Sequence, residues 1–404
     1  MTTASLPATE WNALPAAQQP DWRDHPAYDR VREKLAGVPA LVLPEELRDL
    51  RAGLAEVAEG RARLLQLGDC AESFYECTAE HTARRVTALG TLADRLAARI
   101  GQDVLRVGRL GGQYAKPRSN PVEVVDGVPL PTFRGHLVNS EAPSLEARRH
   151  DPRRLLWGYH FGDEVQRVLR TVRLEEANRP GAPWIHTGPW SSHDALVIDY
   201  DGALVRTDAA TGRLFLGSTH FPWVGARTND PAGAHVALLA AVANPVGAKI
   251  GPASTPAGVV ALCAALDPDR EPGRLSLIVR MGASAVDEAL PPLVRAVRAA
   301  GHPVVWLSDP MHGNTVRTAT GRKTRYLDTL LAEARAVETV LAAQRAQLGG
   351  LHLETAADAV TECVGGPVES EEGLATHYTS LCDPRLNTEQ ASALVDGVFG
   401  TGVF

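Results

Sequence analysis

Residues 275–307, LSLIVRMGASAVDEALPPLVRAVRAAGHPVVWL, contain the pattern that decides the fold. Residues 275–279 are a short apolar run that predicts a buried strand ending at Arg280. Residues 285–300 follow with apolar side chains at helical spacing, and a second short apolar run begins at residue 304. A strand, a helix and another strand in this order predict one parallel βαβ unit.

The same alternation continues along most of the chain. The candidate strands are 63–67, 104–110, 184–187, 221–224, 246–250, 275–279, 304–307 and 351–353. The main candidate helices between them are 82–100, 232–242, 256–266, 285–300 and 325–347. Eight strand–helix units favour an α/β fold of the closed (β/α)8 TIM barrel type. An open dinucleotide-binding sheet is disfavoured, because the glycine cluster at 108–112 lacks the GxGxxG spacing.

The regions outside this alternation predict additions to a single domain. Residues 1–60 precede the first strand and indicate an N-terminal helical extension, and residues 61–404 form the barrel catalytic domain. Residues 111–180 form an elaborated connection, with a loop at 117–131 and a helix near 155–172. No change of composition marks a linker between separate domains.

The composition excludes several classes of protein. The 404 residues are 44% hydrophobic and 22% charged, which is typical of a globular chain rather than a disordered one. Lys and Arg number 41 against 48 Asp and Glu, so the net charge of -7 argues against nucleic acid or an anionic membrane as a partner. The absence of a long apolar run and of a signal-peptide pattern leads us to expect a cytoplasmic protein.

The five cysteines have no CxxC spacing and do not indicate a disulfide framework, so a special cysteine would act as a ligand or nucleophile. One candidate, Cys70, follows the end of a predicted strand.

The residues that follow the predicted strands are of special interest, because barrel enzymes place their chemistry there. Two groups can be recognised among them. The first consists of four cations, Arg109, Arg227, Lys249 and Arg280. Together they suit a ligand that carries both a phosphate and a carboxylate.

The second group has the donor atoms of a metal site. It consists of Cys70, His312, Glu354 and Asp383, which are scattered in sequence but follow strands that a closed barrel brings together. A thiolate, an imidazole and two carboxylates can bind a divalent transition metal. For Cys70 or His312 alone, a buried thiol or an ordinary loop histidine is the more common role.

Lys116, Pro117, Arg118 and Ser119 form a loop with two cations and a hydroxyl, which offers a second phosphate site, although these four residues alone are more typical of an ordinary solvated loop. No GxSxG motif is present, which argues against acyl transfer. The residues thus indicate a metal-assisted enzyme that acts on two phosphorylated small molecules bearing a carbonyl or carboxylate group.

Several longer strings resemble one family. They include LLQLGDCAES at 64–73, RVGRLGGQYAKPRSNP at 106–121, NPVGAKIGP at 244–252, SDPMHGNT at 308–315 and CDPRLN at 382–387. In this order they resemble the class II 3-deoxy-D-arabino-heptulosonate 7-phosphate (DAHP) synthases. The resemblance implies condensation of phosphoenolpyruvate with erythrose 4-phosphate and water to DAHP and phosphate, at the start of the shikimate pathway.

The resemblance also implies roles for the residues above. Arg109, Arg227, Lys249 and Arg280, with the backbone of Ala226, would bind phosphoenolpyruvate, and the 116–119 loop would bind erythrose 4-phosphate. Cys70, His312, Glu354 and Asp383 would hold one divalent metal, Mn²⁺ or Co²⁺ in the first place and otherwise Fe²⁺ or Zn²⁺. Lys249, His312 and Arg109 are the expected catalytic residues. The proton carrier is left open between Lys249 and a water on the metal.

The chain departs from the family pattern in two places that bear on the site. Ala226 stands where the family has glutamate in Gly-Glu-Arg-Thr, which puts water activation in doubt, and Asp194 shortens a usual glutamate. The short N-terminal region resembles forms from antibiotic or phenazine gene clusters. It leads us to expect a role in secondary metabolism and weak or absent inhibition by Phe, Tyr and Trp.

Two alternatives remain open from the sequence. The barrel could take an amino- or imino-substituted tetrose phosphate and serve an aminoshikimate route. It could also be a catalytically reduced barrel that acts through a partner such as a chorismate mutase, an idea that Ala226 alone supports.

A homodimer or higher homo-oligomer is expected from the family. An oxidative disulfide between Cys70 and Cys382 is a further hypothesis.

Overall fold

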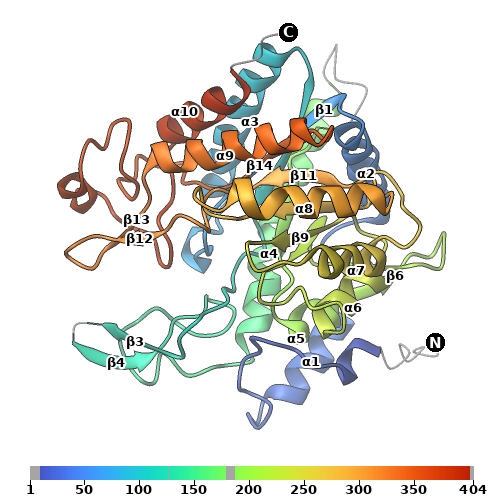
Figure 1. Cartoon of the computed structure of the whole chain (residues 1–404). Helices are drawn as coiled ribbons and strands as arrows, with labels where there is room; N and C mark the ends of the chain where they lie inside the picture. Colours follow the sequence, from blue (N-terminus) through green and yellow to red (C-terminus); the bar gives the residue numbers. More distant parts are fainter. Residues whose placement is uncertain (1–9, 126, 179–186, 401–404) are drawn as a thin grey trace.

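The computed structural model describes residues 10–125, 127–178 and 187–400. Its central feature is a closed barrel of parallel strands surrounded by helices (Figure 1). In spatial order the barrel strands are β1 (Ala62–Gly68), β14 (Leu348–Glu354), β11 (Val305–Ser308), β10 (Leu275–Val279), β9 (Val246–Ile250), β8 (Phe221–Val224), β5 (Trp190–Asp194) and β2 (Asp103–Arg109). The predicted (β/α)8 barrel is confirmed.

One predicted strand was wrong. The third barrel strand is β5 at 190–194, whereas the sequence pattern favoured 184–187, of which residues 184–186 lie outside the described part of the chain. All five residues of β5 are buried, yet the strand reads WSSHD and lacks an apolar run. Ser192 faces the barrel interior, where it accepts a hydrogen bond from Gln66. A strand whose inner face is polar escapes a search for hydrophobic periodicity.

Helices cover the outside of the barrel and follow the predicted alternation. They are α3 (Ala79–Ile100), α4 (Arg154–Ala177), α6 (Ala234–Ala241), α7 (Pro256–Leu266), α8 (Val286–Ala299), α9 (Leu327–Ala343) and α10 (Thr388–Phe399), with the short α5 (Ile198–Asp201) between β5 and β8. Short 3-10 turns occur at η1 (Glu10–Ala13), η2 (Phe74–Glu76), η3 (Gly202–Leu204) and η4 (Glu371–Ala375). Helix α10 was not expected from the sequence. No described helix combines the length and apolar character that crossing a membrane needs.

Helix α2 (Pro44–Ala58) closes the barrel at the amino ends of its strands, and α1 (Tyr28–Gly37) precedes it. Leu50, Leu54 and Val57 of α2 are buried in one cluster with inward-facing strand residues such as Leu64 and Val305. Gly53 allows the close approach, because a Cβ there would lie 2.8 Å from a methyl carbon of Leu105. This packing places helices before β1, as expected for 1–60, but makes α2 part of the barrel core. The boundary between 1–60 and 61–404 stays a prediction.

Three two-stranded hairpins decorate the barrel: β3 (Val122–Val125) with β4 (Val128–Pro131), β6 (Val205–Thr207) with β7 (Leu214–Leu216), and β12 (Val316–Arg317) with β13 (Lys323–Thr324). In Figure 1, β3–β4 and β12–β13 both lie on the left of the barrel, while α2 lies on the right. The loop predicted over 117–131 is therefore only partly a loop, because its second half pairs with itself.

Candidate active site

A cavity of about 670 Å³ opens at the carboxyl ends of the barrel strands. All of the sequence-predicted site residues except Glu354 line it, although they come from residues 70 to 383. Strand register explains this convergence, since Gly68 of β1 pairs with both Arg109 of β2 and Glu354 of β14. Gly68 has a φ of +144°, and a Cβ there would lie 2.9 Å from the carbonyl oxygen of Arg109, so this junction requires glycine.

Arg109 is fixed before any ligand arrives. Its guanidinium is 2% exposed and lies over the ring of Trp223, with 5.3 Å between Cζ and the ring centroid. Nε donates to the carbonyl oxygen of Asp69 at 2.8 Å, and Nη1 lies 2.7 Å from Nε2 of His352. These contacts hold a positive charge in the depth of the cavity without loss of side-chain entropy on binding.

Lys249 and His312 share one carboxylate. The ammonium of Lys249 lies 2.7 Å from Oδ2 of Asp309, and Nδ1 of His312 lies 2.8 Å from the same atom. Burial and the nearby charge of Arg109 lower the pKa of Lys249, although Asp309 opposes the shift. From the sequence, Asp309 stood out only as part of a motif. In the structure it is the group that orients both neighbours.

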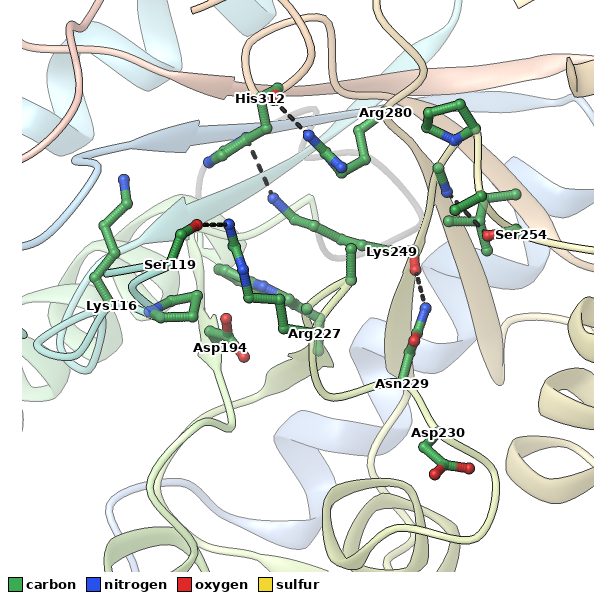
Figure 2. Close-up of a pocket in the computed structure, with 18 of the residues that line it drawn as sticks. Lys116, Ser119, Asp194, Arg227, Asn229, Asp230, Lys249, Ser254, Arg280 and His312 are labelled. Atoms are coloured by element: carbon green, nitrogen blue, oxygen red, sulfur yellow. Dashed lines mark hydrogen bonds between the residues drawn. The ribbon is translucent and has the colours of Figure 1, made fainter. Parts of the chain in front are cut away.

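Arg280 and Arg227 reach the cavity from the ends of β10 and β8. Nη2 of Arg280 donates to the carbonyl oxygen of His312 at 2.5 Å, which ties two predicted site residues together. Nη2 of Arg227 donates to Oγ of Ser119 at 2.6 Å (Figure 2). Arg227 and the neighbouring Ala226 are exposed at the rim, unlike Arg109 and Lys249. The four predicted cations therefore line one cavity but at two depths.

The loop at 116–119 is divided between two environments. Pro117, Arg118 and Ser119 line the cavity, and Arg118 is bound by Glu123 of β3 at 2.9 Å and by the carbonyl oxygen of Phe133. Lys116 also lines the cavity but is buried, with its ammonium 3.2 Å from Oε1 of Glu354 and 2.5 Å from Oδ2 of Asp383. The structure thus groups Lys116 with the predicted metal ligands rather than with the rest of its loop.

The predicted metal ligands surround that lysine. Nε2 of His312 lies 3.0 Å from Oε1 of Glu354, and the backbone N–H of Asp383 donates to Sγ of Cys70 at 3.5 Å. A hydrogen bond from Cys382 lowers the pKa of the Cys70 thiol to about 6, although burial opposes it. His312 and Lys116 hold the pKa of Glu354 well below its usual range despite its burial.

The chemistry of the four predicted ligands suits a metal ion, but their positions in the structure do not. A thiol of lowered pKa, an imidazole and two ionised carboxylates have the chemistry of a transition-metal site. As placed, however, no three or more His, Cys, Asp and Glu side chains in the described ranges form a group that could hold a metal ion. Lys116 lies between the two carboxylates. The residues therefore fit a metal by chemistry, and by geometry only after Lys116 moves aside.

Two cations that the sequence analysis missed complete this cluster. Nη2 of Arg325 lies 2.8 Å from Oε2 of Glu354, and Nζ of Lys323 lies 2.7 Å from Oδ1 of Asp383. Both come from strand β13 and the residue after it. Their alternation in Lys323-Thr324-Arg325 puts them on one face of an extended segment, which is a signal that the sequence offers. Their carboxylate partners could not be read from spacing.

Asp194, which ends β5, is a further cavity residue with an unusual environment. Its side chain is 9% exposed, and Oδ1 has no hydrogen-bond partner among the described residues. Burial raises the pKa of Asp194 to about 6, although Lys249 and Arg109 act in the opposite direction. In Figure 2 it lies on the cavity wall beside Arg227. From the sequence, Asp194 stood out only as a shortened acid.

Comparison with known proteins gives a consistent result. The model of the class-II DAHP synthetase family matches residues 6–179 and 164–398. A "probable phospho-2-dehydro-3-deoxyheptonate aldolase" of Pseudomonas fluorescens is 45% identical over 94% of this chain and 94% of its own length. Phospho-2-dehydro-3-deoxyheptonate aldolase AroG of Mycolicibacterium smegmatis is 38% identical over 95% of this chain and 91% of its own. The phospho-2-dehydro-3-deoxyheptonate aldolase of Streptomyces coelicolor is 38% identical over 96% of this chain and 96% of its own.

Proposed function

The chain belongs to the class-II DAHP synthetase family, and on that premise we propose that it condenses phosphoenolpyruvate with erythrose 4-phosphate and water to give DAHP and phosphate. The observation that carries the proposal is the cavity at the carboxyl ends of the strands. It combines buried cations, rim cations and a separate cluster of thiol, imidazole and carboxylates. Its volume of about 670 Å³ is in the usual range for a small-molecule site.

Phosphoenolpyruvate is the ligand that the deep part of the cavity suits. Arg109, Lys249 and Arg280 present positive charge there, and Arg109 and Arg280 are already held by backbone carbonyl oxygens. Arginine binds carboxylate and phosphate groups through paired hydrogen bonds. A fixed clamp of this kind orients the substrate and converts an encounter of two molecules into a reaction within one complex.

Erythrose 4-phosphate fits the outer part. Ser119 and Arg227 are joined at the rim, and Arg118 lines the same cavity, so this part offers a hydroxyl and two guanidinium groups to a phosphate. Arg227, which the family resemblance assigned to phosphoenolpyruvate, is therefore proposed here for the phosphate of erythrose 4-phosphate. The aldehyde end of the molecule would then point inward. In that arrangement C3 of phosphoenolpyruvate forms the new bond to the aldehyde carbon, and water adds at C2 before phosphate leaves.

A divalent metal, Mn²⁺ or Co²⁺ in the first place, is part of the proposal. Cys70, His312, Glu354 and Asp383 would hold it, and when bound it would polarise the aldehyde as a Lewis acid. Asp309 orients His312 from its other ring nitrogen, a contact that commonly fixes a metal-binding imidazole. Lys249, which shares Asp309, is the candidate for moving protons at the reacting oxygens, from the attacking water and to the new alkoxide, because its lowered pKa brings it closer to neutral pH.

The experiment is phosphate release from phosphoenolpyruvate plus erythrose 4-phosphate, with chelator-treated protein and again after Mn²⁺ or Co²⁺ is added. We expect release only with both substrates and metal together. Omission of either substrate is the control. Bound phosphoenolpyruvate without turnover would contradict the aldose assignment, and an amino-substituted tetrose phosphate would be the next substrate to test. Absence of phosphoenolpyruvate binding would contradict the function itself.

Four expectations from the sequence stay predictions at this point. They are a dedicated role in secondary metabolism, a cytoplasmic location, a homo-oligomeric state with or without a chorismate mutase partner, and insensitivity to aromatic amino acids. The last is the simplest to check, because adding Phe, Tyr or Trp to the same assay should leave the initial rate unchanged.

A further inference from the structure

The carboxyl group of Asp194 is buried, and one of its oxygens lacks a hydrogen-bond partner among the described residues. Its backbone is fixed, because the N–H of Asp194 donates to Oε1 of Gln113 at 3.0 Å. Its carboxyl group lines the cavity with Oδ1 unpartnered among the described residues. Gly225 keeps the space beside it open, since a Cβ there would lie 3.0 Å from Oδ2. A buried polar atom without a partner calls for an explanation, and a ligand bound in the adjoining cavity can supply the missing hydrogen bond.

The charges that face this acid come from every side of the cavity. The ionised form is favoured by Lys249 of β9, by Arg109 of β2 and by His193, the residue before Asp194 in β5. Asp201 of α5 opposes it. Burial outweighs the three cationic influences and raises the pKa of Asp194 to about 6. In the free protein at neutral pH the acid is thus mostly ionised, with Lys249 and Arg109 as its principal sources of favourable charge.

A negatively charged ligand changes this balance. Lys249 and Arg109 are two of the cations that the proposed function assigns to phosphoenolpyruvate. When they bind its phosphate and carboxylate, their charge is neutralised and new negative charge lies near Asp194. Like charges held together in a buried site raise the pKa of one of them strongly, and an acid that becomes neutral can donate a hydrogen bond instead of repelling.

On the basis of the proposed function, we propose that Asp194 takes a proton from solvent when phosphoenolpyruvate binds, and that the resulting carboxylic acid donates a hydrogen bond to an anionic oxygen of that substrate. Binding is then linked to uptake of a proton by the protein. An analogue without negative charge would not trigger the uptake.

The test is calorimetric titration of phosphoenolpyruvate, without aldose, into the full-length protein at pH 7.5. This pH lies above the range in which a phosphate monoester titrates, at about pH 6. Titrations in two buffers of different ionisation enthalpy, such as PIPES and imidazole, give the number of protons taken up. We expect uptake approaching one proton for the wild type, and an affinity that weakens by up to about tenfold per pH unit above neutrality.

The variant Asp194→Asn should bind phosphoenolpyruvate with no proton uptake and with an affinity that is nearly independent of pH in this range. Asp230→Asn is the matched control, because Asp230 lines the same cavity but is exposed at the rim (Figure 2). It should keep the uptake of the wild type. Asp194→Ser serves the same purpose if the asparagine variant does not fold.

The outcomes separate this inference from the proposed function. Wild-type protein that binds phosphoenolpyruvate with no proton uptake would overturn the role of Asp194 and leave the function standing. Uptake that persists in both Asp194 variants would overturn it as well, and would point to Lys249, whose pKa is lowered in the free protein. Failure of the wild type to bind phosphoenolpyruvate at all would overturn the proposed function, and this inference with it.

Discussion

The guanidinium of Arg325 lies 2.8 Å from the carboxylate of Glu354, and both side chains are completely buried. Nε of Arg325 also donates to Oγ1 of Thr315 at 2.9 Å, and Nη1 donates to the carbonyl oxygen of Pro384. One arginine therefore connects the last barrel strand, the loop after β11 and the segment that carries Asp383. Its contacts fix the far side of the cluster of predicted metal ligands.

Replacing Arg325 should destabilise the fold. We expect Arg325→Leu to lower the free energy of unfolding by about 3 kcal/mol, the lower end of the cost of breaking a buried ion pair. The lower end applies because Lys116 and Arg109 still face Glu354. Urea denaturation measures the change. The control is Arg317→Leu, at an exposed site, which should change stability little, and equal losses in the two variants would contradict the prediction.

The buried acid at position 194 should make stability depend on pH. The pKa of Asp194 is raised from 3.8 to about 6, so the folded state binds this proton more tightly than the unfolded state. Its contribution is unfavourable above pH 6 and is relieved as the pH falls from 6 towards 4. Asp194→Asn should therefore be more stable than wild type at pH 8, by up to about 3 kcal/mol, with the difference vanishing near pH 4. Thermal melting at both pH values checks this, and an unchanged difference would contradict it.

Glu333 of α9 should position two loops of the site. Its Oε1 accepts hydrogen bonds from the backbone N–H groups of Met281 and Gly282 at 2.9 and 3.1 Å, and its Oε2 accepts one from Asn314 at 2.5 Å. It thereby joins the loop after Arg280 to the loop of His312. Glu333→Ala should raise the KM for phosphoenolpyruvate by about tenfold, because a small displacement of a clamp residue is costly.

The matched control is Glu338→Ala, further along the same helix and partly exposed. It should leave that KM unchanged. A loss of kcat with KM unaltered in Glu333→Ala would argue against a positioning role toward the clamp.

The two depths of the cavity should separate the two substrates. Arg280→Gln should raise the KM for phosphoenolpyruvate by about 100-fold, because it removes a charge-assisted pair of hydrogen bonds. Ser119→Ala should raise the KM for erythrose 4-phosphate by about fivefold, since it removes one hydrogen bond to a charged group and the support of Arg227. Initial rates with each substrate varied in turn check both, and each variant is the control for the other. The assignment fails if both variants affect the same substrate.

The sequence predicted those parts of the fold in which burial and apolar composition agree. Strands 246–250, 275–279 and helix 256–266 have the bounds that the pattern gave, because each is a mainly apolar segment with a clear end. Strand β5 escaped because four of its five buried residues are polar, and Ser192 is paired with Gln66 inside the barrel. Hydrophobic periodicity reports which side chains avoid water, and it cannot report a polar layer inside a barrel.

The candidate site was predictable where strand ends determine position. Arg109, Lys249 and Arg280 could be placed together from topology alone, since parallel strands in a barrel end at one rim. The partners of Lys116 and the roles of Arg325 and Asp194 could not, because they depend on side chains that meet across loops. Whether a carboxyl group is paired, or is left without a partner, is decided by those contacts and leaves no pattern in the chain.

Helix α2 packs at the amino ends of the strands, and the cavity opens at their carboxyl ends. Arg109 and Lys249, at 2% and 6% exposure, lie at its inner end, while Ser119 and Arg227 border the opening. A molecule bound at the outer end would obstruct the path of a second molecule to the inner end. We therefore expect an ordered mechanism, in which phosphoenolpyruvate binds first at the inner end. An excess of erythrose 4-phosphate should inhibit turnover, because it would occupy the outer end before phosphoenolpyruvate has bound.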